Sequence, residues 1–178
     1  THLTGTNVPD DLSRQMRASY YFLGALLSRF GKAQVAMPGG CDFGVRPIDQ
    51  HIKGFEALGA KVTLPKGGYI RAEAPEEGLH GAHIYFDVVS VGATMNILLA
   101  AVLCSGMTII ENCAKEPHIV DLANFLNAMG AQISGAGTST VTVSGFRPQP
   151  FVEHTIMPDR IVAATILCAG AACGGDVE

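Results

Sequence analysis

The sequence contains two copies of one pattern, about 70 to 75 residues apart. ALLSRFGKAQVA, from Ala25, and AAVLCSGMTIIE, from Ala100, both read as an apolar helix, a glycine stop and a strand. HIKGFEALGAKVTL, from His51, and LANFLNAMGAQISG, from Leu122, both read as an amphipathic helix that ends at Gly-Ala before a strand. The pattern predicts an α/β chain built from a repeated unit.

Each copy then adds one more strand, GGYIRAEAP in the first and TSTVTVSG in the second. With a strand before each copy, the predicted order is βαβαββ, in units near residues 1–80 and 81–150. Residues near 19–75 and 92–145 are expected to superpose. A third copy starts at about residue 154 and ends after its first helix, so we expect the chain to be a fragment.

The composition favours a globular protein and argues against two kinds of partner. The chain has 178 residues, 48% of them hydrophobic, which is enough for one or two buried cores. A formal net charge of −4, without a basic stripe, argues against a nucleic acid partner. The longest apolar run, from Ile97 to Cys104, is far too short to cross a bilayer, so no membrane partner is expected.

The cysteines number five, without the spacing of a disulfide framework or a zinc site, so no metal is expected and a reducing cytoplasm is the expected location. Cys104 and Cys168 lie in apolar runs and are expected in the core. Cys41 differs, because Pro38, Gly39 and Gly40 precede it and place it on a loop.

MPGGCDFGVRPIDQHIKG, from Met37 to Gly54, resembles the active-site loop of the UDP-N-acetylglucosamine 1-carboxyvinyltransferases, within the enolpyruvyl transferase family. A Pro-Gly-Gly-Cys run followed by Arg-Pro is far more specific than a lone glycine motif. Four other stretches also resemble that family, namely RQMRAS, SVGAT, ENCAKEPHIVDLANFL and MPDRI. The likeness therefore runs through most of the chain.

The resemblance implies an inverse α/β barrel of βαβαββ units, with residues 1–178 forming most of one domain and the second domain absent. It implies transfer of the enolpyruvyl group of phosphoenolpyruvate to the 3-hydroxyl of UDP-N-acetylglucosamine, the first committed step of peptidoglycan synthesis. It implies no metal or redox cofactor. The lysine, arginine and aspartate that complete the family's site have no counterpart here, so the isolated chain is expected to be inactive.

Cys41 is the candidate catalytic residue. Addition to an enol ether needs a proton at the methylene carbon, which a positioned acid supplies. A thiol close to Arg46 ionises more readily than an isolated one. The resemblance implies that Cys41 is the proton donor and the residue that fosfomycin attacks; from the spacing alone, an incidental loop thiol is the alternative.

The residues after Cys41 are candidates for substrate binding. Arg46 precedes a proline, which favours an extended backbone, and its guanidinium suits a phosphate or a base. Asp49 has an alternative role as a helix N-cap. Gln50 replaces a leucine of many relatives, a difference that is expected to matter little if the backbone makes the contact. The candidates implied by the resemblance in this stretch are Arg46, Pro47, Ile48, Asp49, Gln50 and His51.

Two other stretches supply candidates. Arg17, in RQMRAS, is expected on a helix that begins near Pro9, and the resemblance favours a ligand contact over a solvated surface position. The run of Val89, Ser90, Val91 and Gly92 precedes an apolar helix whose first N–H groups suit a phosphate, although Ser90 is equally typical of an N-cap.

The sequence departs from the family at two positions. Val88 stands where some relatives have lysine, and Val162 follows Asp159-Arg160-Ile161 where glutamate is usual. An Asp159–Arg160 salt bridge with a structural role is the alternative for that stretch. The departures favour, as a competing hypothesis, a silent nucleotide-sugar-binding paralogue.

Two further alternatives are enzymes. 3-Phosphoshikimate 1-carboxyvinyltransferase shares the repeat, but it is not expected to carry the loop of Cys41. RNA 3′-terminal phosphate cyclase also shares the architecture, but its nucleic acid contacts predict a more basic surface.

Overall fold

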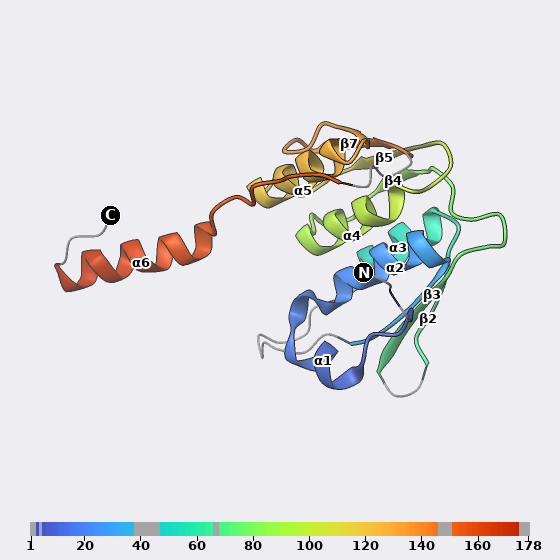
Figure 1. The fold of residues 1–178 in the computed structure, drawn as a ribbon, viewed down its shortest axis with the longest axis horizontal. Coiled ribbons are helices and arrows are strands. Elements are labelled where there is room, and N and C mark those ends of the chain that lie inside the picture. The colour runs from blue at the N-terminus through green and yellow to red at the C-terminus, as the bar shows by residue number, and fades with distance from the viewer. Residues whose placement is uncertain (1–2, 4, 38–46, 66–67, 146–150, 175–178) are drawn as a thin grey trace.

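The computed structural model describes residues 3, 5–37, 47–65, 68–145 and 151–174. Helices and strands alternate along the chain (Figure 1). In order, they are α1 (Asp10–Gln15), the 3₁₀ helix η1 (Arg17–Tyr21), α2 (Phe22–Phe30), β1 (Lys32–Ala36), α3 (Asp49–Ala57), β2 (Lys61–Thr63), β3 (Tyr69–Glu73), β4 (His83–Tyr85), α4 (Val91–Ala101), β5 (Met107–Glu111), α5 (Pro117–Ala128), β6 (Gln132–Ser134), β7 (Thr140–Ser144) and α6 (Arg160–Cys173).

The repeated order predicted from the sequence is confirmed. The series α2-β1-α3-β2-β3 recurs as α4-β5-α5-β6-β7. The strand order of the first sheet is β1-β3-β2, and β5-β7-β6 follow one another in the same order in the second sheet. Neighbouring strands within these two sets of three are antiparallel. The parallel strand β4 precedes the second series beside β5, and a parallel bridge from Asn7 to Gln34 takes the corresponding place in the first.

The glycines of the repeat end equivalent helices. Gly59 follows α3 and Gly130 follows α5, with φ of 93° and 107°, a region that side chains with a Cβ rarely adopt. In each copy the next residue, Ala60 or Ala131, donates its N–H back to the helix at 3.0 Å. The same helix stop is therefore built twice, as the Gly-Ala pairs predict.

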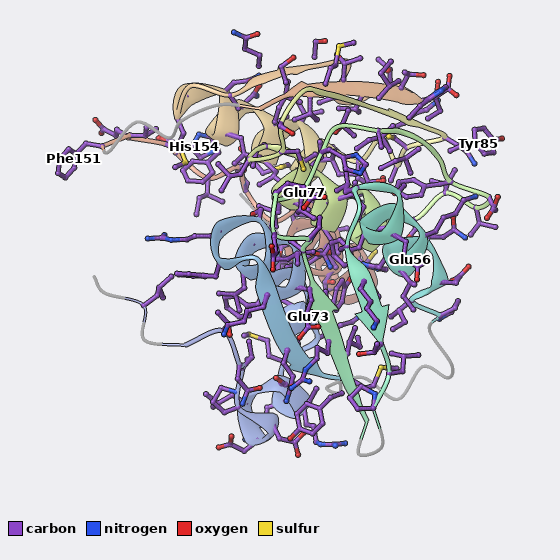
Figure 2. All side chains as sticks on the ribbon, turned by 90° about the vertical axis from the view of Figure 1, so that its right-hand side faces the viewer. Glu56, Glu73, Glu77, Tyr85, Phe151 and His154 are labelled. Carbon is purple, nitrogen blue, oxygen red and sulfur yellow. The ribbon has the colours of Figure 1, made fainter. Side chains whose placement is uncertain are left out.

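The core lies between the two sheets, where α2, α3 and α4 pack together (Figure 1). Gly24 permits the close approach of α2 to α4, because a Cβ there would overlap the carbonyl oxygen of Asn96. The sheets present their other faces to solvent, and Tyr85 on β4 points outward with 57% of its surface exposed (Figure 2). This layering puts the beginnings of α3 and α4 side by side.

Two expectations about cysteines have opposite outcomes. Cys104 is buried as predicted, and burial raises the pKa of its thiol to about 12. Cys168 is exposed, so its prediction as a core residue is wrong. It lies on α6, which extends away from the other elements (Figure 1) and buries none of its side chains. Apolar residues alone do not bury a helix when no other described element packs closely against it.

The prediction of a continuous helix from Pro9 through Arg17 is also wrong. The backbone at Met16 is extended, with φ −131° and ψ 115°, so α1 ends at Gln15 and Arg17 begins the separate 3₁₀ helix. This break redirects η1 toward α4, which it contacts. Within the described ranges, no helix combines the length and the apolar character needed to cross a membrane.

Candidate functional site

Residues predicted to bind substrate come together where α3 and α4 begin. Cys41 and Arg46 lie outside the described residues. Of the others, Gln50 and His51 are buried, with 5% and 6% of their surface exposed, and Gly92 is buried too. Pro47, Asp49 and Val89 are exposed, whereas Arg17, Ile48, Ser90 and Val91 are half-buried.

The ring of Tyr20 joins the three stretches of candidates. The guanidinium carbon of Arg17 lies 5.5 Å from the centre of this ring. The imidazole of His51 meets the same ring edge to face, with 5.0 Å between centres. A Cβ at Gly92 would lie 2.5 Å from the Tyr20 hydroxyl and 3.1 Å from Nε2 of His51, so this position has room only for glycine. Arg17, His51 and Gly92 therefore surround one aromatic side chain.

Asn96 on α4 is completely buried. Its side chain forms hydrogen bonds that fix the positions of Tyr20 and His51. Its Oδ1 accepts the N–H of Gly24 at 2.8 Å, and its Nδ2 donates to the carbonyl of Tyr20 at 2.9 Å. The same Nδ2 lies 3.1 Å from Nδ1 of His51. Because that amide nitrogen is a donor, Nδ1 accepts, and the proton of the neutral imidazole is on Nε2. Asn96 thus fixes both the position and the tautomer of His51.

Burial keeps His51 neutral. Desolvation is the main cause that lowers the pKa of its imidazole from 6.5 to about 4; Asp49 acts in the opposite direction and Arg17 in the same one. Protonation at Nδ1 would also place an N–H of the imidazole against the N–H of the Asn96 amide, so that two donors would face each other. At neutral pH the ring therefore presents an uncharged Nε2–H toward the beginning of α4.

This lowered pKa predicts that stability falls with acidification. As the pH decreases below 6.5, the His51 imidazole of the unfolded chain becomes protonated, whereas that of the folded chain stays neutral down to about pH 4. The free energy of unfolding therefore falls over this range and levels off below about pH 4. The free energy of unfolding should drop by up to about 3 kcal/mol across this window on account of His51. Urea unfolding of wild type and His51→Gln from pH 4 to 7.5 measures the difference. His80→Gln, at an exposed histidine, is the matched control for the substitution itself. Equal profiles for wild type and His51→Gln would contradict the neutral assignment.

Gln50 has a role that the sequence did not indicate. It was expected to matter little, yet its Oε1 accepts the N–H of Asp87 at 2.9 Å. Its Nε2 donates to Asp49 at 2.7 Å and approaches Asp87 at 3.4 Å. Lys53 completes the group through an ion pair of 2.7 Å with Asp87. Hydrogen bonds to Lys53 and then Gln50 lower the pKa of the Asp87 carboxyl.

The capping alternatives are resolved differently at each helix. Ser90 is the N-cap of α4 and accepts the N–H of Ala93 at 3.2 Å, as that alternative predicts. Asp49 is not a cap, because Ile48 occupies the N-cap position of α3. Asp159 caps α6 by accepting from Ile161 at 2.8 Å. Its carboxylate is thereby engaged, and no Asp159–Arg160 ion pair forms in the described structure.

Sequence reasoning missed Tyr20 and Asn96, the two residues that organise the site. A signal existed for Asn96, since it is the polar residue in the apolar run MNILLAA of a helix that is buried on most sides. A buried amide of this kind needs partners, and each partner marks a neighbouring element. For Tyr20, adjacency to RQMRAS was the available signal.

A family model described as EPSP synthase (3-phosphoshikimate 1-carboxyvinyltransferase) matches residues 2–178. The chain belongs to the EPSP synthase family. Among curated members, UDP-N-acetylglucosamine 1-carboxyvinyltransferase 3 of Caldanaerobacter subterraneus subsp. tengcongensis is 61% identical over 99% of this chain. UDP-N-acetylglucosamine 1-carboxyvinyltransferase 2 of Bacillus subtilis is 55% identical over 99% of it. The resemblance stated from the sequence is confirmed.

These relatives of the EPSP synthase family are longer than this chain, which spans 42% of the first and 41% of the second. Solved structures agree on the fold. The enolpyruvyl transferase NikO from Streptomyces tendae superposes with a TM-score of 0.74 at 24% identity, over 93% of this chain and 39% of its own. EPSP synthase from Acinetobacter baumannii gives 0.59 at 21% identity, over 86% and 35%. The enolpyruvyl transferase-like fold predicted from the sequence is thus confirmed.

Proposed function

We propose that this chain is part of an enzyme that transfers the enolpyruvyl group of phosphoenolpyruvate to the 3-hydroxyl of UDP-N-acetylglucosamine, the first committed step of peptidoglycan synthesis. One observation carries the proposal: Arg17, His51 and Gly92, from three separate stretches, surround Tyr20 in a chain 61% identical to a named UDP-N-acetylglucosamine 1-carboxyvinyltransferase. The stretches that converge are those that resemble the family's substrate-binding residues.

The chemistry of the described residues suits a nucleotide sugar. A nucleotide sugar needs donors for its diphosphate and a surface for its base. By helix geometry, the N–H groups of Val91 and Gly92 have no acceptor inside α4, and they lie at the positive end of the helix dipole. Arg17 adds a fixed positive charge beside Tyr20. A neutral His51 would offer an Nε2–H donor without a second charge, so the anion would be bound without a buried imidazolium.

The reaction needs an acid, and Cys41 is the proposed one. It would deliver a proton to the methylene carbon of phosphoenolpyruvate as the sugar oxygen adds to the adjacent carbon and the hydroxyl proton passes to a base. Loss of a proton from the new methyl group and cleavage of the carbon–oxygen bond to phosphate would then release phosphate and leave the enolpyruvyl ether. Arg46 would hold the phosphate or flank the base through its planar guanidinium. The following residues 47–51 then lead directly into the described site.

We also propose that this chain forms most of one domain and that a second domain of the same polypeptide completes the site. The lysine, the C-terminal arginine and the aspartate that the resemblance assigns to the family's site have no counterpart in this sequence. The isolated chain should therefore not release phosphate from phosphoenolpyruvate. A cytoplasmic location fits a mechanism that requires Cys41 as a reduced thiol.

The choice of acceptor tests the proposal in the full-length protein that contains this chain. With phosphoenolpyruvate, phosphate release should be at least about 100-fold more efficient in kcat/KM with UDP-N-acetylglucosamine than with shikimate 3-phosphate, because a site that hydrogen-bonds one acceptor rejects another that leaves its polar groups unpaired. Release with shikimate 3-phosphate alone would assign the other activity of this family. Binding of the nucleotide sugar without phosphate release would identify a silent binding protein instead.

A further inference from the structure

Gln50 connects the two backbone segments that the proposed function assigns to the sugar nucleotide. It lies in the first turn of α3, within residues 47–51, and its side chain reaches Asp87, two residues before the candidate segment 89–92. Only 5% of its surface is exposed, although glutamine is usually a surface residue. Its amide oxygen and its amide nitrogen both have partners.

The partners require an amide at this position. The N–H of Asp87 needs an acceptor, which Oε1 supplies at 2.9 Å. The carboxylates of Asp49 and Asp87 need a donor between them, which Nε2 supplies at 2.7 Å and 3.4 Å. Leucine offers neither group, and glutamate offers the acceptor but adds a third negative charge. Glutamine is the common side chain of this length that satisfies both sides.

Charged side chains surround the amide of Gln50. Asp49 and Asp87 face the amide from α3 and from the segment after β4, and Lys53 of α3 approaches Asp87 from its other side at 2.7 Å. The Lys53–Asp87 pair is largely exposed, and such pairs hold segments together only weakly. The hydrogen bond from the Asp87 N–H to Gln50 is partly buried, since its acceptor lies on a buried side chain. It is therefore the stronger of the two links, because its loss leaves a partly shielded backbone donor without this partner.

We propose that Gln50 is a positioning residue that locks residues 47–51 to residues 89–92, so that both segments receive the sugar nucleotide as one preformed surface. This inference rests on the proposed function. A preformed surface binds its ligand more tightly, because the segments that form it lose little conformational entropy on binding. Gln50 does not touch the reacting atoms, and the step that it influences is nucleotide sugar binding.

The test uses the full-length protein and three variants. Gln50→Leu should raise the KM for UDP-N-acetylglucosamine about tenfold, with kcat and the KM for phosphoenolpyruvate within about twofold of wild type, as expected for lost ground-state binding. Calorimetric titration with UDP-N-acetylglucosamine should show the same loss of affinity without turnover. Gln132→Leu, at an exposed glutamine of β6, is the matched control and should leave every constant unchanged.

Gln50→Glu supplies a readout that a purely structural role would not give. At about pH 5 the introduced carboxyl, when protonated, carries both a donor and an acceptor, so the KM relative to wild type at the same pH should approach one. At pH 8 the ionised side chain faces Asp49 and Asp87, and the KM ratio should exceed that of Gln50→Leu.

The outcomes separate this inference from the proposed function. If wild type neither binds UDP-N-acetylglucosamine nor turns over, the proposed function fails. If wild type is active and Gln50→Leu loses thermal stability with an unchanged KM, Gln50 is structural and the positioning role is overturned. A KM ratio for Gln50→Glu that does not change between pH 5 and 8 also overturns it. A raised KM for Gln50→Leu, together with the pH-dependent ratio for Gln50→Glu, establishes the role.

Discussion

Replacement of Asn96 by leucine is expected to lower the free energy of unfolding of this chain by about 4 kcal/mol. The change keeps the number and branching of the side-chain heavy atoms, although the two methyl groups are bulkier than the amide. It removes an acceptor for the Gly24 N–H and a donor for the Tyr20 carbonyl and for Nδ1 of His51. These groups are buried, so water does not replace the lost partners without disturbing the packing of α2 against α4. Urea unfolding at pH 7.5 measures the loss.

The matched control is Asn124→Leu, at an exposed asparagine of α5, which should change stability by less than about 0.5 kcal/mol. A second effect separates the hydrogen-bond account from simple overpacking. The imidazole of His51 loses the amide that opposes its protonation at Nδ1, so the acid-dependent loss of stability between pH 6.5 and 4 should become smaller. An Asn96→Leu variant as stable as wild type would contradict the role of Asn96.

The repeat and its glycines were predictable from the sequence because they depend on local chemistry. Gly59 and Gly130 end their helices with positive φ, a requirement that a Gly-Ala pair after an amphipathic stretch already indicates. The order of helices and strands follows from the same periodicity. Local rules were insufficient at Met16, where an extended residue separates α1 from η1 without a proline or glycine to mark the break.

The contacts that organise the site were beyond prediction because they join residues far apart in the chain. Gln50 was judged by comparison with leucine in relatives, and its partner Asp87 belongs to the other copy of the repeat. His51 was expected to contact the nucleotide, and the structure adds that Asn96 orients its ring. Cys168 shows the opposite error, since an apolar sequence predicts burial only where another element packs against it.

Replacement of Cys41 by serine in the full-length protein is expected to lower kcat by about 100-fold to 10,000-fold, the range for loss of a positioned general acid. A hydroxyl is a much weaker acid than a thiol, so it cannot supply the proton at a comparable rate. Cys41→Asp should retain measurable turnover, because a carboxylic acid still donates a proton. Phosphate release from phosphoenolpyruvate with UDP-N-acetylglucosamine measures both variants; a Cys41→Ser enzyme with wild-type kcat would exclude Cys41 as the acid.

The other cysteines provide internal controls for the reactivity of Cys41. Cys104 and Cys113 are buried, and burial raises the pKa values of their thiols to about 12 and about 11, so almost none of either is thiolate at neutral pH. Cys168 and Cys173 are exposed on α6. If exposure alone decided reactivity, Cys168 and Cys173 would react, whereas the proposed function predicts selectivity for Cys41 through positioning of the reagent.

Peptide mapping by mass spectrometry after fosfomycin treatment of the full-length protein tests most directly whether this chain carries the acid of the enolpyruvyl transfer. The epoxide should alkylate Cys41 and leave the exposed thiols of Cys168 and Cys173 unmodified. UDP-N-acetylglucosamine should accelerate the modification, because a bound nucleotide sugar positions the reagent beside the thiol. An adduct on Cys113 or Cys173 with Cys41 unmodified would contradict the assignment of Cys41 and the mechanism built on it.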